Sequence, residues 1–449
     1  MRKTIGRVSA PDRRGVLLAL MLLTYGFLGY IAVQLSYAFA CVCLLPWALG
    51  MTYCCVTRGA VRRGAAFWLL CAMNAVLVVT TLINRPEGQD WLNDYWSLLA
   101  CSMLPMLVPT GTSRETLSRQ LLRLGTLFVV CFLPLGLIAM VSVFTGRVIH
   151  VPGLELPVGI AVAGGVDGRV SIFTHPNTAG RLAAFSALFA ACGFMKKRRL
   201  PARIFYGFAI LISLMTLAHS QSRTCFIALG AAAGALAFRA VWLRMEDRRI
   251  RIPAGLLAAA VVLVAVVMGL SGLYEADVAV ARRTAADAPE TVGASHLDDG
   301  EFDVFSTGRD DIWLGALKYL RNHPRSLLTG LGPVDMTKVM GQEFPEMLPH
   351  LNLHNTYLNC LARSGIVYLL LVLALLCTLV RPALRMLTRP DPSRLGLFFA
   401  PAFVCMILCM SVPENMLFVT PGLGSFLFYW MSGYLLSDGE AERMGGNKG

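Results

Sequence analysis

Long apolar runs, separated by short polar segments, dominate the pattern of hydrophobic and polar positions along the chain. Each run approaches the roughly 20 residues that a helix needs to cross about 30 Å of hydrocarbon. Because a backbone in lipid must satisfy its own hydrogen bonds, each run is expected to form a helix. The pattern predicts about twelve transmembrane helices, over residues 15–33, 36–56, 64–83, 96–110, 122–144, 178–194, 204–218, 224–243, 253–273, 366–380, 395–411 and 416–436.

One long polar insertion, residues 275–363, lies between two of these apolar runs. Inside it, residues 306–322 have the periodicity of an amphipathic helix. Thr307 and Asp310 form a pattern like a capping box at its start, and Asn322-His323-Pro324 ends it. We expect this helix to lie against the bilayer or the helix bundle through an apolar face made of Ile312, Trp313, Leu317 and Leu320.

Composition excludes a soluble globular protein with an ordinary surface. The chain has 449 residues, of which 56% are hydrophobic and 15% charged, and its mean hydropathy is +0.62. We predict an all-α polytopic membrane bundle with one large extracytoplasmic loop that contains short amphipathic helices. Residues 1–144 are expected to hold the N-terminal transmembrane helices, 145–436 the core with the large loop, and 437–449 a polar cytoplasmic tail.

The basic residues set the expected orientation. Most of the 40 lysines and arginines fall in alternate loops, including those at 58–63, 114–123, 196–203, 239–251 and 381–394. By the positive-inside rule these loops and both termini are cytoplasmic. The net charge of +13 is spread over short loops and not gathered on one folded face, so it does not indicate binding of nucleic acid.

The predicted external loops hold the candidate chemistry. The first candidate closes the loop that precedes residue 178, where Pro176 fixes the start of a helix and Asn177 or Thr178 can cap its amides. Arg181 follows one turn inside. Such a helix start can receive an anion, and the same pattern is typical of an ordinary capped transmembrane helix.

Two arginines and one histidine form the second set. Arg223 follows Ser222 at an outer helix end, where an arginine also commonly reaches for lipid headgroups, and Arg309 lies in the first turn of the amphipathic helix. His354 can transfer a proton near neutral pH, or can serve as a structural histidine. His350 and His354 have the spacing of metal ligands on a helix, but no third ligand lies at a suitable spacing, and the 13 cysteines form no zinc or disulfide pattern, so we predict no metal.

These features together resemble the bacterial O-antigen ligase and O-antigen polymerase superfamily. The resemblance rests on the spans with one large external loop, the Pro176-Asn177 helix start, the Ser222-Arg223 pair, and Arg309 followed after a long gap by His354-Asn355-Thr356-Tyr357-Leu358. It covers roughly residues 145–436. The first five spans share only the topology.

The resemblance implies an enzyme in the bacterial cytoplasmic membrane with its active site on the extracytoplasmic face. Such an enzyme takes a glycan from an undecaprenyl pyrophosphate carrier and joins it to an acceptor hydroxyl of a glycolipid or glycan, with inversion and without metal or cofactor. Membrane lipids surround it. Arg223 and Arg309 then correspond to the pyrophosphate-binding arginines, His354 to the catalytic base, and Asn177, Arg181 and Asn355 to candidate substrate contacts; the role of His175 stays unassigned.

Three other functions remain open. A multi-pass transporter or flippase is the main rival, although the apolar runs contain no Asp, Glu or Lys. A metal-dependent oligosaccharyltransferase could use Glu87, Asp90 and Asp94 as ligands. A structural membrane protein would tolerate replacement of the outward Arg and His residues. The choice among ligase, polymerase and protein O-glycosyltransferase, and the identity of the sugar, also stay open.

Overall fold

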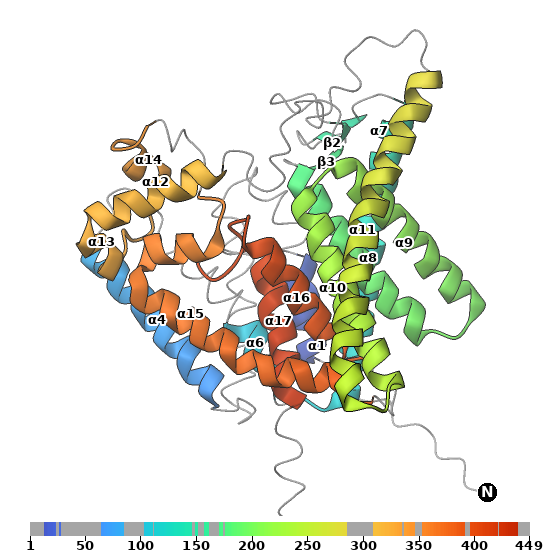
Figure 1. Ribbon diagram of the computed structural model, residues 1–449, viewed down its shortest axis with the longest axis horizontal. Helices are drawn as coiled ribbons and strands as arrows, with labels where there is room; N and C mark the ends of the chain where they lie inside the picture. Colours follow the sequence, from blue (N-terminus) through green and yellow to red (C-terminus); the bar gives the residue numbers. More distant parts are fainter. Residues whose placement is uncertain are drawn as a thin grey trace, which may run out of the picture.

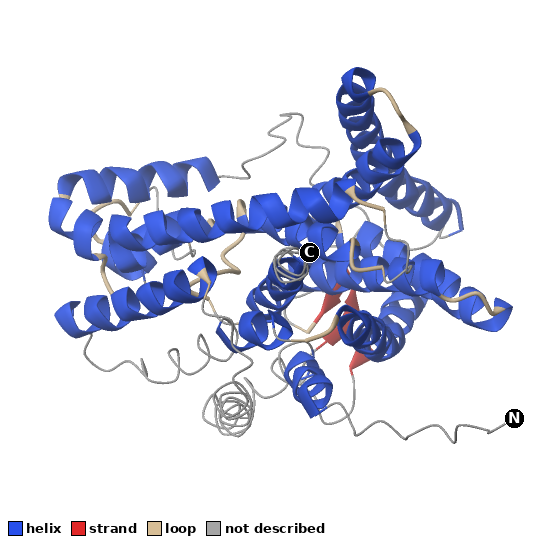
Figure 2. Cartoon of the chain, turned by 90° about the horizontal axis from the view of Figure 1, so that it is seen from below, coloured by secondary structure: helices blue, strands red, loops and turns tan. Residues whose placement is uncertain are grey.

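The computed structural model consists almost entirely of helices (Figures 1 and 2). It describes residues 13–23, 27, 64–84, 103–110, 112–145, 149–150, 157–160, 170–173, 176–284, 309–334, 336–345, 353–390, 396–420 and 422–438. The helices are α1 (Arg13–Leu23), α4 (Ala65–Asn84), α6 (Met103–Thr110), α7 (Arg114–Thr145), α8 (Pro176–Lys196), α9 (Leu200–Ser220), α10 (Arg223–Arg244), α11 (Arg248–Thr284), α12 (Arg309–Asn322), α13 (Pro324–Thr329), α14 (Met336–Gly341), α15 (Thr356–Thr388), α16 (Phe399–Ser411) and α17 (Leu423–Asp438).

The prediction of a multi-pass helical membrane protein is confirmed. Among the described residues, seven helices are long and apolar enough to cross a membrane, namely α4, α7, α8, α9, α10, the segment Arg249–Leu273 of α11, and α15. The predicted span 36–56 lies outside the described residues, and 15–33 and 96–110 are described only in part. The number twelve therefore stays a prediction.

The helices are accompanied by one small antiparallel sheet, which the sequence did not predict. Strands β1 (Ile149–His150), β2 (Pro157–Ile160) and β3 (Val170–Ile172) pair in the order β1-β2-β3, with Val158 opposite both Ile149 and Ile172. The sheet lies in the connection from α7 to α8, which the sequence predicted as an external loop (Figure 1). Strands of two to four residues are too short to show an alternation of apolar and polar positions.

Helix α8 lies at the centre of the bundle, whereas α11 lies at its edge. In the most apolar part of α8, 78% of the residues are buried, compared with 6% in α11. Close packing against α8 depends on small residues: a Cβ added at Gly193 would lie 2.4 Å from the ring of Tyr206 on α9. Ser213 of α9 also donates a hydrogen bond to Ser186 of α8 (2.9 Å). These contacts hold α9 tightly against α8.

Helix α15 is broken at Gly365, and the break joins the membrane bundle to the layer of α12, α13 and α14, which belongs to the predicted external loop and is called the external layer. Gly365 has φ 79° and ψ 177°, a region open only to glycine. The break frees the carbonyls of Ala362 and Arg363, which accept hydrogen bonds from the amides of Leu331 (2.8 Å) and Gly332 (2.9 Å). The sequence predicted a span from residue 366 onward, so the segment 356–364 is an N-terminal extension that the hydropathy pattern missed.

A second hydrophobic core holds the external layer together. Ile312 and Leu320 of α12 pack with Met340 of α14 and Leu358 of the first segment of α15. The predicted amphipathic helix is thus present and ends at Asn322 as predicted, but Leu317 is 50% exposed and does not belong to its buried face. Tyr319, two residues further along the helix, is buried and belongs to that face. Figure 1 shows α12, α13 and α14 gathered beside the end of α4 and the start of α15.

The opposite end of α15 is capped by a buried cation. Arg239 of α10 donates through one terminal nitrogen to the carbonyls of Met386 (2.7 Å), Leu387 (3.1 Å) and Arg389 (2.7 Å). Its guanidinium group also stacks on the ring of Phe398 at 4.4 Å. Arg239 therefore satisfies carbonyls that the end of a helix leaves without intrahelical partners.

Candidate active site

The start of α8 is organised by hydrogen bonds among its own first residues. Arg181 donates through Nε to the carbonyl of Asn177 (3.2 Å) and through Nη2 to the hydroxyl of Thr178 (3.1 Å). The side chain of Asn177 points elsewhere, since its Nδ2 donates to Oε1 of Glu414 (2.7 Å). The predicted neighbours Asn177 and Arg181 therefore do meet, and they extend toward a residue that is remote in sequence.

Glu414 joins three elements of the site. It lies in the loop between α16 and α17, its side chain is 11% exposed, and its Oε1 accepts from Asn177 and from Arg309 Nη2 (3.3 Å). Its backbone carbonyl accepts from the hydroxyl of Thr356 at the start of α15 (2.8 Å). The starts of α8, α12 and α15 are thus brought together although they lie far apart along the chain.

The loop that carries Glu414 is fastened along the first segment of α15. Asn359 donates to the side chain of Asn415 (2.7 Å), and Arg363 donates to the carbonyl of Val419 (3.2 Å). Thr356 also accepts a hydrogen bond from the amide of Met416 (3.1 Å). A loop with this many bonds to one helix holds its carboxylate in a fixed place.

Arg309 is oriented by this loop and keeps donors for a ligand. Nη1 donates to the carbonyl of Pro413 (2.5 Å) and Nη2 to Glu414. A guanidinium group has five N–H donors, so about three remain beyond these two bonds among the residues that the structure describes. The side chain is 16% exposed. A partly paired arginine of this kind can bind an anion without first being ordered.

His354 lies two residues before Thr356, which contacts this loop. Trp313, one turn after Arg309 on α12, donates through Nε1 to the carbonyl of Leu353 (3.0 Å), which fixes the backbone just before His354. Asn355 then caps α15, because its Oδ1 accepts from the amides of Tyr357 (2.9 Å) and Leu358 (3.0 Å). His354 is half-buried and is placed between two anchored positions.

Arg223 lies at the same end of the bundle. The turn from α9 to α10 packs on α8, since a Cβ added at Gly180 would lie 2.8 Å from Cβ of Ser222 and 2.9 Å from Oγ of Ser220. Gly180 directly precedes Arg181. Arg223 begins α10 and is exposed, which suits a group that meets a ligand at the surface.

Unusual backbone conformations gather around these residues. Phe173, Gln221, His354 and Phe418 are the non-glycine residues with positive φ in the described part of the chain, at 66°, 49°, 44° and 60°. Each is a site residue or lies within four residues of Asn177, Arg223 or Glu414. Bulky residues rarely adopt positive φ, and such strain is concentrated at functional sites.

Sequence reasoning missed Glu414. Residues 412–415 form the short connection between the predicted spans 395–411 and 416–436, and the sequence pattern indicates no role for the carboxylate in it. One sequence feature could have indicated a role for Glu414. It is a single acidic residue in a very short connection between two apolar runs, predicted to lie on the same side as several external arginines. The hydropathy pattern alone does not show which remote helix start that loop contacts.

Several other candidates lie outside the described residues, namely His175, Thr307 and His350, and the possible metal ligands Glu87, Asp90 and Asp94. Within the part that the structure describes, no group of three or more His, Cys, Asp or Glu side chains has an arrangement that could hold a metal ion.

Part of the chain is similar to one known protein family. Residues 208–373 match the family model described as O-Antigen ligase. The match confirms the resemblance to the O-antigen ligase and polymerase superfamily and supports a membrane enzyme that transfers glycans. Arg223, Arg309, His354 and Asn355 fall inside the matched residues, whereas Asn177, Arg181 and Glu414 lie outside them. No curated protein matches the chain.

Proposed function

We propose that this protein transfers a glycan from an undecaprenyl pyrophosphate carrier to the hydroxyl of a glycolipid or glycan acceptor. The reaction takes place on the extracytoplasmic face of the bacterial cytoplasmic membrane, with inversion at the sugar and without a metal. The observation that carries the proposal is the convergence of Asn177, Arg309 and the start of α15 on Glu414, beside His354. The distribution of basic residues supports the assignment of this end to the outer face.

The departing pyrophosphate explains the need for arginines. When the bond between the anomeric carbon and the phosphate oxygen breaks, the bonding electrons leave with undecaprenyl pyrophosphate and its negative charge grows. Guanidinium groups can meet phosphate oxygens with two parallel hydrogen bonds. Arg223 and Arg309 fill this role, and Arg309 is pre-oriented by Pro413 and Glu414, so that little reorganisation is needed as the charge develops.

The acceptor requires a base. Its hydroxyl oxygen attacks the anomeric carbon from the face opposite to the leaving group, and the hydroxyl proton is transferred to His354. An imidazole suits this step because it titrates near neutral pH, and general-base help of this kind contributes about 10² to 10⁴ in rate. Hydrogen bonds hold the backbone on both sides of His354, and one of them comes from Trp313, which lies one turn after Arg309 on α12.

Asn177, Arg181 and Asn355 act in this proposal mainly through the shape of the site. Asn177 orients Glu414, Arg181 holds the first turn of α8, and Asn355 caps α15. Glu414 is likewise a positioning residue, because it orients Arg309. Arg181 can in addition attract the anionic carrier, since it lies one turn inside a helix N-terminus.

The test is a transfer assay with purified full-length protein. Radiolabelled undecaprenyl pyrophosphate oligosaccharide is supplied with lipid A-core, with a second carrier-linked glycan, or with a protein acceptor, and the products are separated. We expect transfer to one of these acceptors, loss of transfer with His354→Ala, and full activity in the presence of a chelator. Absence of turnover with every acceptor, or equal turnover by wild type and His354→Ala, would contradict the proposal.

A further inference from the structure

A basic pocket lies at the end of the bundle opposite to the candidate active site. It has a volume of about 610 Å³ and is lined by Arg119, Leu122, Arg123, Thr126, Leu127, Val130, Lys197 and Tyr206. Lys197 directly follows α8, whose 21 residues span about 30 Å at 1.5 Å per residue. The pocket is therefore separated from Asn177 by about the thickness of a membrane.

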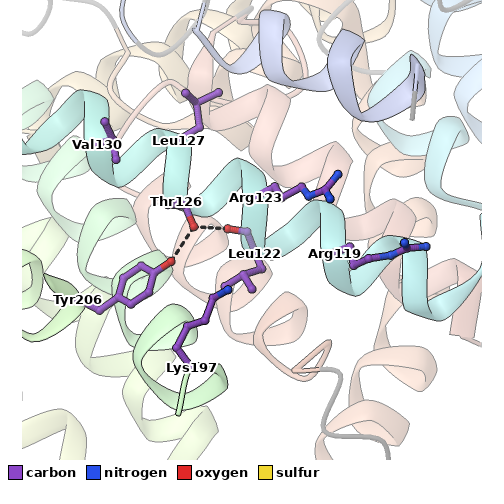
Figure 3. A pocket seen from close by; sticks show the side chains of 8 residues that line it. All are labelled: Arg119, Leu122, Arg123, Thr126, Leu127, Val130, Lys197 and Tyr206. Carbon is purple, nitrogen blue, oxygen red and sulfur yellow. Dashed lines mark hydrogen bonds between the residues drawn. The ribbon is translucent and has the colours of Figure 1, made fainter. Parts of the chain in front are cut away.

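The pocket changes from basic to apolar along one face of α7. Its α7 residues recur at intervals of three and four, so they share a face, with Arg119 and Arg123 at one end and Leu127 and Val130 at the other (Figure 3). From Arg119 to Val130 the helix rises about 16 Å, close to half of the hydrocarbon thickness. Arginines at headgroup depth thus place Val130, which is 50% exposed, near the middle of the bilayer.

The facing wall comes from α9 and from the connection before it. The hydroxyl groups of Tyr206 and Thr126 are hydrogen-bonded (2.7 Å), which links the two walls of the pocket, and Lys197 approaches from the same side as Tyr206 (Figure 3). The neighbouring lysine has a different role, since Lys196 donates to Ser118. Lys197 thus lines the pocket and Lys196 braces α7.

The basic groups of the pocket have few partners within the protein. The guanidinium group of Arg119 donates to the hydroxyl of Thr116 (3.2 Å) and pairs with no carboxylate among the described residues. The side chains of Arg123 and Lys197 form no hydrogen bond or ion pair with any residue that the structure describes. Three cations with no carboxylate among the described residues of the pocket, next to an apolar wall that faces lipid, are complementary to an anion that carries a hydrocarbon chain.

We propose that this pocket binds an anionic phospholipid of the cytoplasmic leaflet. The phosphate lies among Arg119, Arg123 and Lys197, and an acyl chain follows Leu127 and Val130 along α7. A lipid in this place contacts α7, α9 and the residue that follows α8. At their other ends, α7 leads into the sheet and α8 begins at the candidate active site. The site does not depend on the transfer reaction, and it can be tested without activity.

The test measures lipid selectivity of the purified full-length protein in nanodiscs. Spin-labelled phosphatidylglycerol and spin-labelled phosphatidylcholine are compared by the fraction that the protein immobilises. We expect wild type to prefer phosphatidylglycerol, and Arg123→Ala or Lys197→Ala to weaken that preference about fivefold each, which corresponds to about 1 kcal/mol for each basic residue near the surface. Arg198→Ala is the matched control, because Arg198 is the adjacent basic residue, is equally exposed, and does not line the pocket.

A second arm distinguishes a lipid from a free anion. Excess inorganic phosphate is expected to leave the bound phosphatidylglycerol in place, and Leu127→Gln is expected to lower its retention although no charge is removed. Thermal unfolding of each variant confirms that it remains folded. Equal retention of the two lipids, equal loss with Arg198→Ala and Lys197→Ala, or displacement by inorganic phosphate would each overturn the proposal.

Discussion

The two ends of the bundle treat their basic residues differently. At the end that carries the candidate active site, Arg309 is held by a carboxylate and a backbone carbonyl, and residues of the site adopt rare backbone conformations. At the opposite end, Arg123 and Lys197 extend into a pocket without a carboxylate partner among the described residues. A cation that is oriented in advance suits stabilisation of a transition state. A cation left with no partner suits a ligand that the membrane supplies continuously.

The largest effect is expected at Arg309. Arg309→Ala removes a pre-oriented donor to the leaving group, and losing one such donor commonly lowers turnover by about 10² to 10³. The initial rate of glycan transfer measures the effect. Arg321→Ala, an exposed arginine in the last turn of the same helix, is the control and should leave the rate unchanged. A similar loss of transfer rate in both variants would show that α12 acts only through its total positive charge and not through the oriented side chain of Arg309.

Gly365→Ala should produce the second largest effect, because it disturbs the connection between the bundle and the external layer. The added Cβ would lie 2.1 Å from the carbonyl oxygen of Leu328, in a backbone region that costs about 1–3 kcal/mol for other residues. We expect faster hydrogen exchange at the amides of Leu331 and Gly332. Gly269→Ala in α11, where a Cβ meets nothing within 4 Å, should be neutral or slightly stabilising.

Glu414 should have a smaller effect that depends on the substituent. Glu414→Ala leaves the donors of Asn177 and Arg309 without their acceptor, and a buried donor without a partner costs about 1–3 kcal/mol. We expect about a tenfold rise in KM for the donor, since Arg309 loses its orientation. Glu414→Gln retains an acceptor oxygen and should recover much of the affinity. Equal behaviour of the two variants would show that the pairing with Arg309 has no role.

The smallest effect concerns pH and the external layer. Hydrogen bonds from Asn322 and His323 lower the pKa of Glu343 below its ordinary value of 4.5. Because the folded-state pKa is depressed, the stabilisation is present above pH 4.5 and is lost as the pH falls through the lowered value. Amides of α14 should therefore lose exchange protection only below pH 4.5, and Glu343→Gln should abolish this pH dependence.

Sequence reasoning succeeded where a single periodic pattern decides the structure. Hydropathy predicted the long helices, and the periodicity of residues 306–322 predicted α12 and its end at Asn322. It failed where the outcome depends on contacts between remote segments. The helical segment 356–364 ends at Gly365, where its last free carbonyls accept hydrogen bonds from the remote amides of Leu331 and Gly332. Glu414 reaches the candidate site because its loop lies along α15. The basic pocket also needed the structure, since it joins α7 to Lys197 and Tyr206.

The most direct test of the account separates carrier binding from chemistry in two variants of the full-length protein. Binding of undecaprenyl pyrophosphate and the rate of glycan transfer are measured for Arg309→Ala and His354→Gln. We expect Arg309→Ala to bind the carrier about 10- to 100-fold more weakly, as the loss of charged hydrogen bonds implies. His354→Gln should bind the carrier like wild type and lose transfer. Unchanged carrier binding by Arg309→Ala, or normal transfer by His354→Gln, would contradict the account.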